Sequence, residues 1–459
     1  MKKILALMLS LVMCLSLVAC GSNNSSSNSS AGSDSSNTAQ ESPDTSAAPA
    51  TTDSASTEGA SDSAGTGSAT EITLWHYFDA SNDKQAIIDW VDEYNSLQDD
   101  IHITATYVSR DELMNQYTIG ALSGELPDIG MVDSPDMASY ISLGVFEDIT
   151  DRLNAWGELD KFYPGPLSSC MDSEGRLYGL PQNSNCLALA CNMDLLKDAG
   201  YDHMPTSLDE LQEMVAATTD PADGVYGFAM CCISTEEGTF QLLPWLRSNY
   251  NGQGVNVDNL TADSAVHGLG VLGDFVANGY MSKECVNWTQ SDAFNQWTAG
   301  KAAMAEVGTW HLAMTNEIGG AFEYGFCLLP TGSEGTSTST IGGENFGICS
   351  GAADKDACVD FLTWLCSKEK EGEWAVTAGK IPTRSDSVAN YDYEQDGFAV
   401  FVDEMNYAQA RGPHPEWPTI SEAVYTAAQS VFVDGTDPAD ALAKAMETID
   451  PIVAETPLP

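Results

Sequence analysis

The stretch that decides the fold begins with Ile72-Thr73-Leu74-Trp75-His76-Tyr77-Phe78, a run of strand-forming residues. After it, Ile87, Val91 and Tyr94 fall on one face of a helix, and residues 101–108 alternate as a strand does. A helix over 110–122 then leads into the short apolar run Asp128-Ile129-Gly130-Met131-Val132. Strands that alternate with helices form β-α-β units, so we predict a largely parallel sheet with helices on both faces.

The second half of the chain repeats this pattern. We expect strands at 187–192, 226–230 and 302–307, and helices at 207–217, at 261–277, before Trp297 and after Asp437. Ser207-Leu208-Asp209-Glu210 is a capping box, which marks the start of a helix. Because residues 71–459 exceed the size at which one hydrophobic core keeps growing, we expect two α/β lobes.

The N-terminal residues indicate export. Lys2 and Lys3 precede an apolar run over 4–18, which is shorter than the roughly 20 residues of a membrane span and fits a secretory signal over 1–19. The next phrase, Leu17-Val18-Ala19-Cys20-Gly21, resembles a bacterial lipobox. We therefore expect Cys20 to become a lipidated N-terminus that anchors the protein to a membrane. The alternative is an ordinary signal followed by a chance cysteine.

Residues 21–70 form a separate block. They contain no Val, Ile, Leu, Met, aromatic, Lys or Arg side chain. Such a segment cannot bury enough apolar surface to offset its conformational entropy, so we expect a disordered tether over 20–70.

The charge of the chain excludes some partners. The 67 acidic residues outnumber the 18 basic ones, for a net charge of −49. A field of this sign repels nucleic acid and anionic lipid head groups, so we expect no nucleic-acid partner. A sulfate or phosphate ligand is disfavoured for the same reason, whereas a cationic ligand stays open.

Signatures of catalysis and of metal binding are missing from the sequence. Ten cysteines lie in the folded part without a CxxC or zinc spacing, and the six histidines are scattered. We expect mostly free, buried thiols, although an exported protein could pair some of them. Gly268-Leu269-Gly270-Val271-Leu272-Gly273 matches GxGxxG, but it lies inside a helical pattern rather than at a strand-to-helix turn. We therefore expect no enzyme, no cofactor and no metal site.

An ordered series of phrases carries a family resemblance. They are Ser123–Ile129 (SGELPDI), Leu143–Thr150 (LGVFEDIT), Gly175–Pro181 (GRLYGLP), Ala190–Gly200 (ACNMDLLKDAG), Gly300–Met304 (GKAAM) with Gly308-Thr309-Trp310, Gly379–Arg384 (GKIPTR) and Gly412–Trp417 (GPHPEW). In this order and spacing the chain resembles the family 1 extracellular solute-binding proteins, the carbohydrate ABC importer receptors that are relatives of maltose-binding protein. Each phrase is weak alone, and the series covers nearly all of 71–459.

The resemblance implies a periplasmic-binding-protein-like fold, with two lobes joined by crossing strands around a hinged cleft. Residues 183–185 would lie at the first crossing. The expected division is 1–19 signal, 20–70 lipidated tether, 71–182 first part of lobe 1, 183–330 first part of lobe 2, 331–384 return to lobe 1, and 385–459 a helical part that packs mainly on lobe 2.

Candidate ligand residues follow from the resemblance and from strand ends. The resemblance implies that Trp310 stacks on a sugar ring; the alternative is a core tryptophan. Trp75 and His76 end the first strand, where open α/β sheets place ligands, although Trp75 could equally be core. The remaining candidates are Asp133 and Ser134 after the Asp128 strand, Asn185 at the hinge, and, as weaker ones, Trp245, Glu344, Arg411 and His414.

The expected function is a monomeric receptor on the extracellular face of the membrane. It would capture a carbohydrate, an oligosaccharide by preference, and deliver it to the permease of an ABC importer. Two alternatives stay open. The same scaffold could bind a polyamine, a peptide or an organic anion, or the chain could be a secreted glycosidase, which requires two carboxyl groups about 5–9 Å apart.

Overall fold

The structure is a computed structural model that describes residues 69–79, 81–248, 255–387 and 397–458. The expected signal, the lipidation site Cys20 and nearly all of the tether lie outside the described residues. The described residues all belong to one compact unit. Within the part that the structure describes, no helix is both long enough and apolar enough to cross a membrane.

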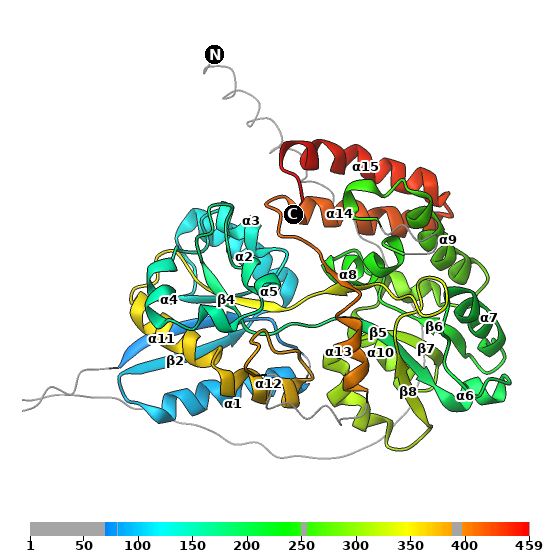
Figure 1. The fold of residues 1–459 in the computed structure, drawn as a ribbon, viewed down its shortest axis with the longest axis horizontal. Coiled ribbons are helices and arrows are strands. Elements are labelled where there is room, and N and C mark those ends of the chain that lie inside the picture. Colours follow the sequence, from blue (N-terminus) through cyan, green and yellow to red (C-terminus); the bar gives the residue numbers. More distant parts are fainter. Residues whose placement is uncertain (1–68, 80, 249–254, 388–396, 459) are drawn as a thin grey trace, which may run out of the picture. The chain divides into compact units, whose positions relative to one another are not determined.

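The first sheet has the strand order β2-β1-β3-β10-β4. Its strands are β1 (Thr70–His76), β2 (Ile101–Tyr107), β3 (Ile129–Asp133), β4 (Gly179–Pro181) and β10 (Glu344–Ile348). Strand β1 runs parallel to β2 and β3, whereas β10 is antiparallel to β3 and β4. Helices α1 (Ser81–Leu97), α2 (Arg110–Ser123) and α11 (Lys355–Leu365) pack on these strands, and α12 (Lys368–Ala378) packs on α1 (Figure 1).

The second sheet has the order β6-β7-β5-β8. Its strands are β5 (Leu187–Asn192), β6 (Tyr226–Ala229), β7 (Ala302–Gly308) and β8 (Tyr324–Cys327). Only the β6–β7 pair is parallel. The helices that pack on these strands are α6 (Met193–Asp198), α7 (Leu208–Thr218), α10 (Gln290–Thr298) and α13 (Phe398–Glu404).

Two sheets flanked by helices are what the sequence predicts, but the sheets are more mixed than largely parallel. The strands of the β-α-β units, β1 to β3, are parallel as expected. Strand β10 follows the long excursion through the second sheet, and β5 follows a crossing from the first sheet. A helical crossover between neighbouring strands makes them parallel. Strands β10 and β5 follow other connections, so they can pair antiparallel with their neighbours.

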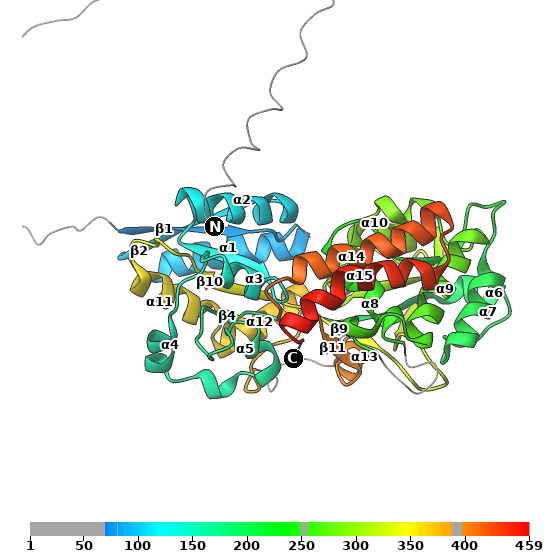
Figure 2. The ribbon, with the colours of Figure 1, turned by 90° about the horizontal axis from the view of Figure 1, so that it is seen from above.

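The remaining elements connect or cover the two sheets. They are α3 (Met137–Ser142), α4 (Thr150–Trp156), α5 (Pro164–Ser168), α8 (Glu236–Leu246), α9 (Asp263–Ala277), α14 (Trp417–Gln429), α15 (Pro438–Glu455), the paired strands β9 (Ser339–Ile341) and β11 (Ala408–Ala410), and short 3-10 or π turns. Figure 2 shows α14 and α15 side by side along α8 and α9, and all four helices share one apolar core with α7.

Local chemistry places the helix starts. The Ser207 hydroxyl accepts from the backbone N–H of Glu210 at 3.2 Å, as its capping box predicts. The Glu210 carboxylate does not return to Ser207 but accepts from the N–H of Thr206 at 2.7 Å. Asp437 caps α15 by accepting from Ala439 at 2.9 Å.

The GxGxxG stretch lies within α9, as the helical pattern predicts. A Cβ on Gly268 would stand 1.9 Å from the carbonyl oxygen of Trp245. This glycine therefore lets α9 approach the backbone of α8 closely, and it serves helix packing rather than a cofactor loop.

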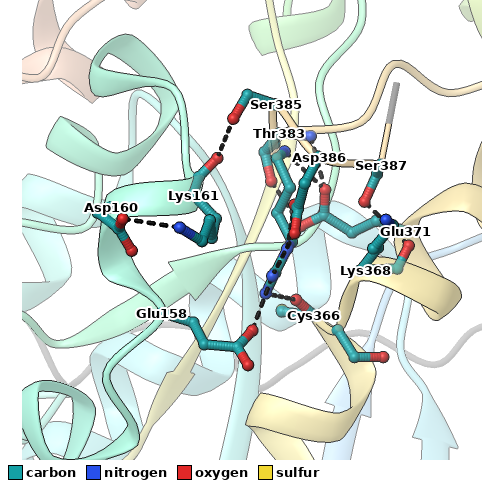
Figure 3. Close-up of polar contacts among 12 residues, drawn as sticks. Glu158, Asp160, Lys161, Cys366, Lys368, Glu371, Thr383, Ser385, Asp386 and Ser387 are labelled. Atoms are coloured by element: carbon teal, nitrogen blue, oxygen red, sulfur yellow. Dashed lines mark hydrogen bonds and ion pairs between the residues drawn. The ribbon is translucent and has the colours of Figure 1, made fainter. Parts of the chain in front are cut away.

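Three crossing segments run next to each other between the sheets. Ser184 forms a β-bridge with Ile381, and Asn185 forms one with Gly342. Figure 3 shows how the third crossing segment is fastened: the Glu371 carboxylate on α12 accepts from the N–H of Thr383 at 2.8 Å and from that of Arg384 at 2.9 Å. The guanidinium of Arg384 in turn donates to Glu158 at 2.7 Å.

Candidate functional site

A cavity of about 280 Å³ lies where the crossing segments meet the end of the first sheet and the start of α8. Its lining combines four kinds of side chain: aromatic, acidic, basic and uncharged polar. The aromatic residues are Tyr77, Phe78, Tyr107, Phe240 and Trp310; the acids are Asp79, Asp83, Asp133, Glu236, Glu237 and Glu344; the bases are Arg110, Lys380 and Arg411; and Ser109, Asn185, Thr289 and Gln290 complete it.

The first sheet contributes residues that follow its parallel strands. Tyr77 and Phe78 come directly after β1, Ser109 lies two residues beyond the end of β2, and Asp133 is the last residue of β3. The carboxyl ends of neighbouring parallel strands meet at one edge, which is where open α/β sheets bind ligands. The topology of β2-β1-β3 therefore brings these side chains together.

The second sheet contributes Trp310, which follows the last residue of β7, Gly308, by two positions. A Cβ on Gly308 would stand only 2.1–2.4 Å from three carbons of the Trp310 ring. The ring therefore folds back over a position that only glycine can occupy. Phe240 of α8 lies beside it, with ring centroids 6.1 Å apart.

Lys380 lies at the centre of one charged cluster. Its Nζ is 3.3 Å from Asp83 and 3.6 Å from Glu344, and all three side chains are largely buried. Burial alone lowers the pKa of Lys380, but the two carboxylates outweigh it and hold the pKa above its usual value. Burial raises the pKa of Asp83 to about 6, with Lys380 opposing and Glu344 adding to the shift. The Lys380 ammonium also stands 5.2 Å from the Trp310 ring centroid.

Arg411 lies at the centre of a second cluster, which joins β3 of the first sheet to α8. Its guanidinium binds the Asp133 carboxylate at 2.6 and 2.8 Å and donates to Glu236 on α8 at 2.6 Å. Arg110 on α2 adds a contact to the same Asp133 at 2.9 Å. Burial raises the pKa of Asp136 to about 7, with Glu236 adding and Arg110 opposing.

Some polar atoms of the lining have no protein partner. Among the described residues, Asp83 Oδ1, Asn185 Oδ1 and Glu236 Oε2 are buried without a hydrogen bond. Buried acceptors are costly unless a donor reaches them, so the cavity suits a ligand with several hydroxyl or amine donors. In the same described ranges, no group of three His, Cys, Asp or Glu side chains is arranged to hold a metal ion.

The family model for the bacterial extracellular solute-binding proteins matches residues 89–399. The chain belongs to this family. The match includes both sheets except β1, and it confirms the resemblance that the phrases of the sequence carry. The chain is therefore a bacterial extracellular solute-binding protein.

Relatives and solved structures agree with this assignment. The lactose-binding protein of Rhizobium radiobacter is 22% identical over 66% of this chain and 71% of its own length. The maltose-bound MalE3 of T. maritima superposes with a TM-score of 0.73 at 22% identity, over 83% of this chain and 99% of that one. A solute-binding protein of Thermotoga lettingae bound with α-D-tagatose gives a TM-score of 0.74 at 21% identity, over 84% and 100%. At these identities the likeness establishes the two-lobed fold.

Five of the ten ligand candidates from the sequence line the cavity of this solute-binding protein. They are Trp310, Asp133, Asn185, Glu344 and Arg411. The structure thus brings together residues that are far apart in the sequence and that come from both sheets and the crossings. Whether each one touches a ligand stays a prediction.

The other five candidates lie elsewhere. Trp75 stacks on Tyr117 with centroids 6.3 Å apart, and Trp245 is fully buried and donates to Glu306 at 2.7 Å. His76 is 1% exposed, and burial lowers its pKa to about 4. The backbone N–H of Ser134 donates to the carbonyl of Gly343. His414 is held by the Thr456 carbonyl and by the N–H of Glu416. These contacts argue for structural roles.

Several lining residues were not predicted as ligand candidates from the sequence, notably Tyr77, Phe78, Asp83, Glu236 and Lys380. Tyr77 and Phe78 directly follow β1, which ends at His76, so extending the candidates from the end of the strand to the two residues after it would have included them. Lys380 belongs to the Gly379–Arg384 phrase. Asp83 and Glu236 have no such signal, because acids are common in the first turn of any helix.

Proposed function

We propose that this solute-binding protein is the receptor of a carbohydrate ABC importer, and that it binds a short carbohydrate in the cavity between its two sheets. The observation that carries the proposal is the cavity lining, in which the Trp310 ring stands among buried acceptor atoms that have no protein partner. Sugar rings present apolar C–H faces, which aromatic rings cover, and hydroxyl donors, which carboxylate and amide oxygens accept.

The size and the charge of the cavity fit this ligand class. A volume of about 280 Å³ is near the lower end of the roughly 300–1,000 Å³ typical of small-molecule sites, which favours a short oligosaccharide over a long one. Its bases are already paired with protein carboxylates, so the free acceptors remain for hydroxyl groups. The lactose-binding relative and the maltose-bound and tagatose-bound structures support the same class.

The proposed lobes are 71–182 with 331–384, and 183–330 with 385–459. We place Trp310, Asp133, Asn185, Glu344 and Arg411 at the ligand. The ligand would bind the closed form better and would therefore shift an existing equilibrium between open and closed forms. The permease would recognise the closed form. The protein would act as a monomer, with no cofactor and no metal, and it would catalyse nothing.

A ligand screen tests the proposal. Purified protein is titrated calorimetrically with neutral mono-, di- and trisaccharides, with spermidine and with a tripeptide. We expect one or more sugars to bind and to raise the melting temperature, while the amine and the peptide do not. Binding of spermidine alone would replace the carbohydrate with a cationic ligand. Release of reducing ends from a bound oligosaccharide would instead favour the glycosidase alternative.

Membrane attachment is tested separately. If Cys20 carries the lipid, Cys20→Ala leaves the protein unprocessed or releases it into the medium. A Cys20→Ala protein that stays membrane-bound with a cleaved signal would contradict lipid anchoring at this residue. Its sugar affinity, measured in parallel, should equal that of the wild type because the cavity is formed by other residues.

A further inference from the structure

The ten cysteines of the folded part stand as thiols in the structure, and all but Cys327 are buried. Burial raises the pKa of the Cys232 thiol, with neighbouring Cys285 adding to the shift, and burial raises the pKa of the Cys191 thiol, with neighbouring Cys327 adding to it. The family is extracellular, where thiols escape the reducing pools of the cytosol. Backbone geometry then decides which of these pairs can become a disulfide.

Cys232 and Cys285 meet the geometric requirement. The backbone N–H of Cys232 donates to the carbonyl of Cys285 at 3.0 Å. With standard bond lengths on either side, one such bond puts the two Cα atoms on the order of 5–6 Å apart, inside the range of about 4.4–6.8 Å that disulfides span. Both side chains lie in the same apolar core, 1% and 0% exposed.

A side chain from α14 fixes the same two segments. The Gln429 Nε2 donates to the carbonyl of Cys232 at 2.6 Å and to that of Val286, next to Cys285, at 3.2 Å. The segment after β6 and the turn Lys283–Asn287 are therefore held together by bonds that do not involve sulfur. The short distance between the two cysteines is a property of the fold.

The second pair lacks this geometry. In the antiparallel β5–β8 ladder, Cys327 stands opposite Leu189, and Cys191 stands opposite Gly325. The two cysteines are thus diagonal neighbours on one face, a relation with a separation of about 7–8 Å, and disulfides do not form beyond about 7 Å without backbone movement. Cys191 and Cys327 therefore serve as an internal control.

We propose that Cys232 and Cys285 form a disulfide when the chain folds after export. Each thiol loses one hydrogen, and a small-molecule disulfide accepts the two electrons and two protons and leaves as two thiols. Because the folded state hides both sulfurs, this exchange takes place before the core closes. The same burial then shields the bond from reductants. The bond steadies the segments that precede Thr289 and Gln290 in the cavity wall.

The test is oxidative refolding of the full chain. The protein is unfolded with reductant, refolded with a mixture of oxidised and reduced glutathione, alkylated in denaturant and analysed by intact mass and peptide mapping. We expect a species that carries two alkyl groups fewer than the fully reduced protein, with Cys232 linked to Cys285 and with Cys191 and Cys327 alkylated. Since the bond closes a long loop, refolding under reducing conditions should lower the melting temperature by several degrees.

Variants identify the partners. Cys232→Ala and Cys285→Ala should each remove the link and the difference between oxidised and reduced melting temperatures, whereas Cys231→Ala and Cys191→Ala should keep both. If Cys232→Ala does not fold, peptide mapping of the wild type and of Cys231→Ala still shows whether Cys232 is linked to Cys285. Alkylation of Cys232 and Cys285 after oxidative refolding would overturn the proposal, and so would a link that involves Cys231 or that joins Cys191 to Cys327.

Discussion

At the scale of single residues, the site depends on a tryptophan whose position is set by a neighbouring glycine. The Trp310 ring occupies the space that any side chain at position 308 would need. The ring is half-buried rather than buried, with one side against Phe240 and His311. This exposure separates it from Trp245, which the sequence ranks as a candidate as well but which is fully buried beside Phe228.

The contribution of the Trp310 ring can be tested without removing the ring. Gly308→Ala should displace it and weaken sugar binding about tenfold, which corresponds to about 1.4 kcal/mol. Trp310→Ala should weaken binding at least as much. The control is Gly270→Ala on α9, because a Cβ at this position would lie 3.9 Å from the nearest atom, the Cγ of Pro438. This alanine should leave the affinity unchanged. Calorimetric titration measures all three. Wild-type affinity in Trp310→Ala together with a strongly lowered melting temperature would make the ring a core residue instead.

We expect Asp83 to make ligand binding depend on pH. Its ionised carboxylate can accept a ligand hydroxyl at Oδ1, and burial raises its pKa to about 6. Affinity should therefore be full above pH 7 and should fall as the pH drops through about 6. The stability effect has the opposite sign, because between pH 4 and 6 the folded state holds a proton that the unfolded state lacks. Asp83→Asn should remove the pH dependence of affinity. An unchanged profile in that variant would exclude Asp83 as the titrating group.

At the scale of elements, the crossing segment that carries Lys380 depends on one carboxylate of α12. Glu371 is 1% exposed, and it accepts from the backbone N–H groups of Thr383 and Arg384 and from the Thr383 hydroxyl (Figure 3). These bonds hold the segment that follows Lys380 against α12. The lysine in the cavity is thus placed by a residue that does not line the cavity.

Glu371→Gln should destabilise the protein and weaken ligand binding. The amide of glutamine presents N–H groups to donors that need an acceptor, and an unsatisfied buried group costs about 1–3 kcal/mol. Glu373→Gln on the same helix is the matched control, since Glu373 is half-exposed and its ion pair is with Lys370. It should change stability by less than about 0.5 kcal/mol. Chemical denaturation measures both, and equal midpoints would contradict the anchoring role.

The elements could be predicted from the sequence, whereas their assembly could only partly be predicted. Strand β5 spans 187–192 and α15 follows its Asp437 cap as expected, because periodicity and capping are local. Glu371 and Glu373 look alike in the sequence. What distinguishes them is a partner segment twelve residues further on, which meets α12 only after the crossing forms. Five of the ten candidates line the cavity for the same reason. Family phrases and strand ends mark local positions, whereas acids in the first turn of a helix carry no such signal.

At the scale of the whole folded unit, Arg411 connects the first sheet to α8. It is 278 residues from Asp133 in the chain and 175 from Glu236, yet it binds both carboxylates. Arg247 fixes the backbone just before it by donating to the carbonyls of Gln409 and Ala410. Two carboxylates in a desolvated site repel each other, and a buried arginine between them offsets this repulsion.

Removing this connection should disfavour the closed form on which ligand capture depends. Arg411→Met leaves Asp133 and Glu236 facing each other, and breaking such a buried pair costs about 3–5 kcal/mol, so affinity should fall by tenfold or more. Arg411→Lys keeps the charge but loses the bidentate contact with Asp133. Its affinity should therefore lie between those of the wild type and Arg411→Met. Arg152→Met is the control, because its ion pair with Asp356 is exposed. Titration gives the affinities, and small-angle scattering with and without sugar follows closure. Wild-type affinity and scattering in Arg411→Met would show that closure does not depend on this bridge.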